Sequence, residues 1–168
     1  QPQQIMAQDR KVIDEAYAGD IIGVFDPGVF SIGDTICDKK MKVEYAGIPT
    51  FAPEHFAIVE QIDSLKRKQF AKGITQIAQE GAIQMFFLPD SGMERVYVGV
   101  VGMLQFEVLQ FRMENEYGVK YNRTDTPHCL VRFVTSSETD LKALNLMQST
   151  KWVKDSKGRD LLLFTADY

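Results

Sequence analysis

The sequence has little of what marks a metal centre, a secreted domain or a membrane protein. Its 168 residues include two cysteines and two histidines, and no Cys-X-X-Cys pair. No hydrophobic run approaches the roughly 18 to 20 residues that cross a bilayer. Cys37 and Cys129 are far apart in the chain, which predicts free, buried thiols in a reducing compartment. These absences argue against a disulfide framework, a zinc module and a transmembrane helix.

The motifs of nucleotide binding and nucleophilic catalysis are also missing. A phosphate loop would read GxxxxGK[ST] and a nucleophile elbow GxSxG, and neither pattern occurs. His55 and His128 are not spaced with Cys, Asp or Glu as a metal site requires. Gly99 and Gly102 fall between an expected strand and an expected helix, but the first glycine of a dinucleotide-binding fingerprint is absent. We therefore expect no catalytic, cofactor-binding or metal-binding residue in this chain.

What is present is the composition of an ordinary globular protein. Hydrophobic residues make up 45% of the sequence and charged residues 25%, and the formal net charge is -4. A chain of this length buries a real core without disulfides or metal ions. The first residue is Gln1 rather than Met, and we expect the chain to have been cut from a longer protein.

Residues 1–50 are predicted to form short strands joined by turns. Gly and Pro separate β-rich stretches at hairpin spacing, with strands expected at 12–13, 20–25 and 29–35. This segment is too short to close by itself, so we expect part of a β-barrel with an open edge. Pro49 and Pro53 cannot continue a strand ladder, and they mark a boundary before a second domain at 51–168.

The pattern over 55–124 predicts the order β-α-β-β-α-β, which is the arrangement of a ferredoxin-like sandwich. The strands are expected at 55–62, 82–88, 95–101 and 119–124. The first helix is expected to begin at Asp63 or Ser64 and to end at Gly81. In the second helix, Leu104, Val108 and Phe111 are predicted to form one apolar stripe, flanked by Leu109 and Met113.

Residues 130–164 predict a β-α-β-β extension that lengthens or packs on the second sheet. Its short helix is expected to turn Leu141 and Leu144 inward. The predicted fold class is therefore α+β. A partial β-barrel segment is followed by a ferredoxin-like βαββαβ sandwich and a C-terminal extension.

The densest basic cluster lies in the first turns of the first predicted helix. It consists of Lys66, Arg67, Lys68 and Lys72. Positive charge at a helix start opposes the helix macrodipole, which suggests that these charges serve a partner. A solvated polar face is the alternative interpretation.

Several stretches resemble translational GTPases. The sequence DEAYAGDIIG and the later IGDT are similar to the second, β-barrel domain of these proteins. Further stretches make the chain resemble the bacterial peptide chain release factor three family more than elongation factor G. They are GIPTFAPE at 47–54, QIAQEGA at 76–82, GVVGMLQFEV at 99–108 and EYGV at 116–119.

This resemblance implies the end of the barrel domain followed by the third domain of a translation-termination factor. Such a protein is cytoplasmic and binds the ribosome through ribosomal RNA and small-subunit protein. It promotes release of class I release factors in a GTP-dependent cycle. The domain that binds GTP or GDP with Mg²⁺ would precede Gln1, so the resemblance assigns no GTPase residue here. Under it, Lys66, Arg67, Lys68 and Lys72 are hypothesised to contact ribosomal RNA phosphates.

A stand-alone ferredoxin-like domain that binds a small regulatory ligand is the second hypothesis. Such a domain would dimerise through a sheet edge, and it would need the β segment at 12–35 to be self-sufficient. The open edge of that segment argues against it. An enzyme with an unrecognised site is a third hypothesis, disfavoured by the absence of a convergent acid, base or metal set.

Overall fold

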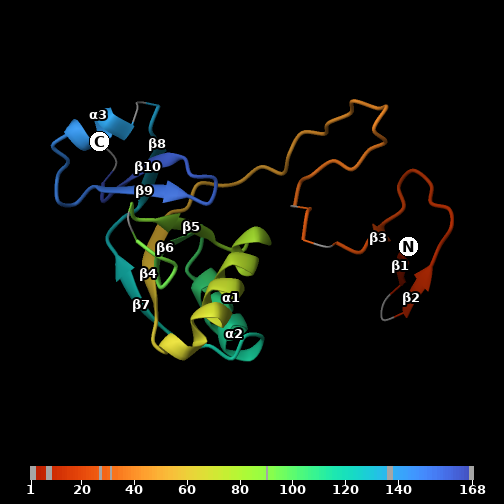
Figure 1. Ribbon diagram of the computed structural model, residues 1–168, viewed down its shortest axis with the longest axis horizontal. Helices are drawn as coiled ribbons and strands as arrows, with labels where there is room; N and C mark the ends of the chain where they lie inside the picture. Colours follow the sequence, from red (N-terminus) through yellow and green to blue (C-terminus); the bar gives the residue numbers. More distant parts are fainter. Residues whose placement is uncertain are drawn as a thin grey trace. The chain divides into compact units, whose positions relative to one another are not determined.

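A computed structural model describes residues 3–6, 9–26, 28–30, 32–89, 91–135 and 138–166 (Figure 1). The chain divides into two compact units, Gln1–Gly47 and Ile48–Tyr168. The first unit contains one antiparallel sheet in the order β2-β1-β3. Its strands are β1 (Gln3–Met6), β2 (Asp9–Val12) and β3 (Ile22–Gly23). These described strands form an open sheet, without barrel closure.

Two strand predictions for the first unit are wrong. The strand expected over 20–25 is reduced to β3, and the described residues of 29–35 form no strand. Val29 and Ile32 there are 73% and 60% exposed. A strand is stable only when its backbone groups find a partner, and no described strand pairs with this stretch.

The second unit is built on one seven-stranded antiparallel sheet. Its strand order is β7-β4-β6-β5-β9-β10-β8. The strands are β4 (His55–Gln61), β5 (Gln84–Phe87), β6 (Arg95–Val100), β7 (Tyr121–Thr126), β8 (Leu130–Phe133), β9 (Lys151–Asp155) and β10 (Asp160–Phe164). The helices are the 3₁₀ turn η1 (Ser64–Lys66), α1 (Arg67–Gln79), α2 (Leu104–Asn115) and α3 (Glu138–Ala143).

The predicted element order of this unit is confirmed. Residues 55–126 run β-α-β-β-α-β, although β7 begins two residues later than expected. The C-terminal extension continues the same sheet, because β9 pairs antiparallel with β5. Among the described residues, no helix is long and apolar enough to span a membrane.

Side chains along these strands alternate between the two faces of the sheet, and they form one hydrophobic cluster on each face. In β4, Ala57 and Val59 pack with buried residues of α1 and α2, whereas Phe56 packs with Phe86 and Tyr97 in the second cluster. Val153, Leu161 and Leu163 of the extension complete that second cluster. Figure 1 shows both long helices beside the strands β4 to β7. Helices thus pack on one face of strands β4 to β7, and buried side chains on the other face cluster with side chains of the extension.

Helix α1 forms for the reasons that the sequence suggested. The Asp63 carboxylate accepts a hydrogen bond from the Leu65 N–H at 2.9 Å, which caps the helical turn. Phe70, Ile74 and Ile77 are fully buried on one face. Gly81 ends the segment with a φ of 79°, a left-handed conformation that favours glycine.

The apolar stripe predicted for α2 faces solvent, and its predicted flank faces the core. Leu104, Val108 and Phe111 are 71%, 48% and 65% exposed, and the buried residues are instead Phe106, Leu109 and Met113. Both sets follow helical spacing, so periodicity in this helix does not determine which side faces the sheet.

Expectations for four single residues are also resolved. Leu141 is buried as predicted, but Leu144 is 53% exposed because α3 ends at Ala143. The two cysteines are free as predicted. However, both Cys37 and Cys129 are exposed, so the prediction of buried thiols is wrong.

Close approach of the two long helices generates the first testable prediction. A Cβ atom on Gly73 would lie 2.8 Å from both Met113 Sδ and Tyr117 Cγ. We expect Gly73→Ala to lower the free energy of unfolding by about 1–3 kcal/mol, because this overlap outweighs the better helix propensity of alanine. Chemical denaturation measures the change.

The matched control is Gln76→Ala, which lies on the exposed face of the same helix. We expect it to change stability by less than about 0.5 kcal/mol. Stabilisation by Gly73→Ala would contradict close packing of α1 against α2.

Candidate nucleic-acid interface

The predicted basic cluster lies at one end of the second unit. Lys66 closes η1, and Arg67 and Lys68 open α1, with Lys72 one turn further along. The strand register brings Gln61 at the end of β4 opposite Tyr121 at the start of β7. The start of α1 therefore shares this end of the sheet with the connection that leads from α2 into β7.

Two members of the cluster have partners within the chain. The Lys66 Nζ donates a hydrogen bond to the Gly118 carbonyl at 2.6 Å, which connects the start of α1 to the residues that follow α2. The Arg67 guanidinium forms an ion pair with Glu94 at 3.3 Å. Both side chains of that pair are substantially exposed, at 63% and 45%, so solvent screens the attraction and its contribution to stability is small.

The other two members, Lys68 and Lys72, point away from the core. Both residues are exposed, and their i, i+4 spacing places them on the same face of α1. Within the part of the chain that the structure describes, neither side chain has an ion pair or a hydrogen bond. Two ammonium groups are thus available to a partner, one helical turn apart.

Nearby carboxylates neutralise only part of the positive charge of the basic cluster. Glu94 pairs with Arg67, and the Asp63 carboxylate is occupied by the Leu65 N–H. The local charge therefore remains positive on a chain whose net charge is -4. An anionic partner is the chemistry that such a patch favours, because clustered cations release counterions from phosphates.

Sequence reasoning missed a second set of cations, which stack on aromatic rings. The Arg159 guanidinium lies 4.5 Å from the centroid of Phe133, and Lys154 Nζ lies 5.9 Å from that of Trp152. Four cationic residues and Trp152 fall within 151–159, which is the signal that could have predicted it. Asp155 pairs with Arg159, and Asp160 pairs with Lys154. These ion pairs neutralise part of the positive charge of the hairpin.

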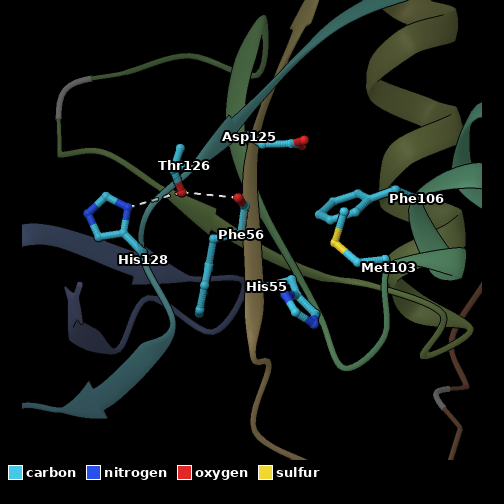
Figure 2. Close-up of a pocket in the computed structure, with 7 residues that line it drawn as sticks. All are labelled: His55, Phe56, Met103, Phe106, Asp125, Thr126 and His128. Atoms are coloured by element: carbon cyan, nitrogen blue, oxygen red, sulfur yellow. Dashed lines mark hydrogen bonds between the residues drawn. The ribbon is translucent and has the colours of Figure 1, made fainter. Parts of the chain in front are cut away.

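At the opposite end of β4 lies a small pocket (Figure 2). Its volume is about 220 Å³, and its lining residues are His55, Phe56, Met103, Phe106, Asp125, Thr126 and His128. Small-molecule sites usually enclose about 300–1,000 Å³. The pocket is thus small for the regulatory ligand of the alternative hypothesis.

His128 is the buried polar residue of this pocket. Its Nε2 donates to the Ser149 carbonyl at 3.0 Å, and its Nδ1 lies 3.0 Å from the Thr126 hydroxyl. The oxygen of that hydroxyl also lies 3.0 Å from the Phe56 carbonyl, a contact drawn in Figure 2. Through Thr126, the imidazole therefore connects β7 and the loop before β9 to β4. Burial lowers the pKa of His128, and the nearby Lys151 ammonium lowers it further. The hydrogen bond to Ser149 raises the pKa and offsets part of this effect.

The residues present do not fit a guanine nucleotide or its Mg²⁺. The sequence holds no phosphate loop. In the described ranges, no group of three His, Cys, Asp or Glu side chains could hold a metal ion.

Comparisons with known proteins cover the whole chain. Residues 45–168 match the family model described as class II release factor RF3, C-terminal domain, and residues 1–39 match elongation factor G domain 2. Peptide chain release factor 3 of Symbiobacterium thermophilum is 46% identical over 168 residues, which are 100% of this chain and 31% of that protein. The same factor of Rippkaea orientalis is 46% identical over 167 residues, 99% of this chain and 31% of the relative. The chain thus spans about a third of the length of these curated relatives.

Burial of His128 predicts how stability depends on pH. Its pKa in the folded chain lies below the ordinary value of 6.5, so folding favours the neutral ring. The stabilisation is complete above pH 6.5 and is lost as the pH falls from 6.5 toward the folded pKa. We expect the free energy of unfolding to decrease between pH 7.5 and pH 5 in denaturation experiments.

His128→Gln keeps hydrogen-bonding capacity and removes the titration. We expect this variant to show a flatter pH dependence, whatever its stability at pH 7.5. His55→Gln is the control, because His55 is exposed. An equal loss in the wild type and in His128→Gln would contradict the assignment to His128.

Proposed function

The chain belongs to the class II release factor RF3 family, and we propose that it forms a ribosome-binding portion of a translation-termination GTPase. The whole protein would promote departure of class I release factors from cytoplasmic ribosomes in a GTP-dependent cycle. The match of residues 45–168 carries this proposal. GTP and Mg²⁺ would bind outside these 168 residues. We further assign β4 to β7 with α1 and α2 to a ferredoxin-like sandwich, whose strand order they follow.

The basic cluster is the proposed contact with ribosomal RNA. Lys68 and Lys72 supply two exposed ammonium groups on one face of α1. Lys66 and Arg67 add charge while they also hold the helix start against Gly118 and Glu94. Phosphate contacts of this kind supply affinity and orientation without sequence readout. The cluster would therefore position the domain on the ribosome rather than recognise a base sequence.

The residues that join the two units support a role in transmitting the state of the GTPase. Pro53 is buried, and the Glu54 N–H donates to the Val100 carbonyl at 3.0 Å. The Gln84 side chain donates to the Phe51 carbonyl at 2.7 Å. Residues 51–54 are thus attached to the sheet, and Ile48 and Pro49 precede them. We propose that changes in backbone dihedral angles near residues 48–50 allow the domain to reorient, because residues 51–54 are hydrogen-bonded to the sheet.

The RNA proposal predicts a change in salt dependence. Replacing Lys66, Arg67, Lys68 and Lys72 together with Gln should weaken ribosome co-sedimentation and flatten the plot of log affinity against log salt concentration. The double variant Lys68→Gln/Lys72→Gln isolates the two exposed ammonium groups. We expect it to reduce the magnitude of the slope by about one for each phosphate that no longer meets a lysine.

The matched control is Lys39→Gln/Lys40→Gln, which removes the same charge from exposed lysines of the first unit. It should leave the slope nearly unchanged. If the double variant and the control changed the slope equally, the reduction would reflect net charge alone, and the proposed RNA contact would be wrong.

A further inference from the structure

Helix α2 presents an apolar stripe to solvent. Leu104, Val108 and Phe111 are 71%, 48% and 65% exposed, and they recur at the spacing of one helical face. Val101 and Met103, just before the helix, are a further 40% and 45% exposed. Single exposed apolar residues are ordinary, whereas a continuous set on one face marks an interaction site.

The stripe is not needed for the core. Phe106, Leu109 and Met113 are 1%, 0% and 0% exposed, so the opposite side of the same helix already fills the space above the sheet. The outward face of the neighbouring helix α1 has no such apolar stripe. The outward residues of α1 are Lys68, Lys72, Gln76 and Gln79, all of them polar and exposed.

The charges beside the stripe are acidic. By helical spacing, Glu107 and Glu114 lie along one side of it, and both are exposed. In the described part of the chain neither carboxylate has an ion pair. Arg112, on the other side, is held by Glu80 and Glu116 together. Arg123 of β7, whose guanidinium lies 5.0 Å from the Phe106 ring of the same helix, pairs with Asp125. The surroundings of the stripe therefore contain five carboxylates and two guanidinium groups, and both guanidinium groups already have carboxylate partners.

We propose that the α2 stripe, defined as Leu104, Val108 and Phe111 with the flanking Glu107 and Glu114, docks a protein segment that presents Lys or Arg beside apolar side chains. The inference rests on the proposed function, since the segment would belong to the ribosome. Exposed Leu and Phe side chains supply the apolar area, and the carboxylates select a basic partner. The same carboxylates repel RNA phosphates and anionic lipid. The helix layer thus offers phosphate-binding cations on α1 and a protein-binding stripe on α2.

The test measures affinity for purified ribosomes and begins with the apolar residues. Leu104→Gln/Val108→Gln/Phe111→Gln should weaken ribosome binding by about tenfold, as loss of an interface anchor does. Its thermal unfolding midpoint should remain within a few degrees of the wild type, because the three side chains are exposed. An unchanged affinity overturns the proposal. If the triple variant does not fold, the charge variant described next decides.

The charge variant distinguishes a protein partner from an RNA partner by whether ribosome binding weakens or strengthens. Glu107→Lys/Glu114→Lys adds positive charge beside the stripe. It should weaken binding to a basic protein segment, whereas it would strengthen binding to RNA. Tighter ribosome binding by this variant therefore overturns the proposal.

A diazirine amino acid at position 111 identifies what covers the stripe. Irradiation on the ribosome should attach it to a protein peptide that contains Lys or Arg. A crosslink to RNA, to residues of this chain or to no macromolecule overturns the proposal. The same probe at position 68 should crosslink RNA and serves as the reference. If position 68 crosslinks RNA and position 111 crosslinks no protein, the proposed function stands and only the docking proposal is wrong. If the wild-type protein does not co-sediment with ribosomes, the proposed function and the docking proposal are both wrong.

Discussion

The structure depends on strand β4, which contributes to two cores at once. Because successive side chains of a strand point to opposite faces, Ala57 and Val59 meet the helices while Phe56 meets the second cluster. A shift of register by one residue would exchange these sets. The pairing of β4 with β6 and β7 is therefore strongly specified, and this register positions both long helices and the extension.

The placement of the helices explains why two different surfaces arise on one layer. Both helices bury one face against the same side of the sheet, so their outward faces are free to differ. On α1 that face is polar and basic, and on α2 it is apolar with acidic flanks. The Lys66 bond to Gly118 and the close contact at Gly73 hold the helices together. The two surfaces therefore move as parts of one domain.

Much of the second unit could be predicted from sequence, because its signals agree with one another. Helix α1 has one apolar face, an Asp63 cap and Gly81 at its end, so propensity and packing coincide. In α2 apolar residues occur on two sides, and only the tertiary fit of Phe106 under the helix decides between them. The basic cluster was visible as a run of charges. The Lys66 bond spans 52 residues of sequence, and no local pattern reports such a contact.

The central claim is that this domain meets the ribosome through the start of α1. A cryo-electron microscopy reconstruction of the protein on a terminating ribosome tests it most directly. The account predicts that Lys68 and Lys72 lie within hydrogen-bonding distance of ribosomal RNA phosphates. A well-resolved complex in which the start of α1 faces solvent, or a part of the ribosome without phosphates, would contradict it.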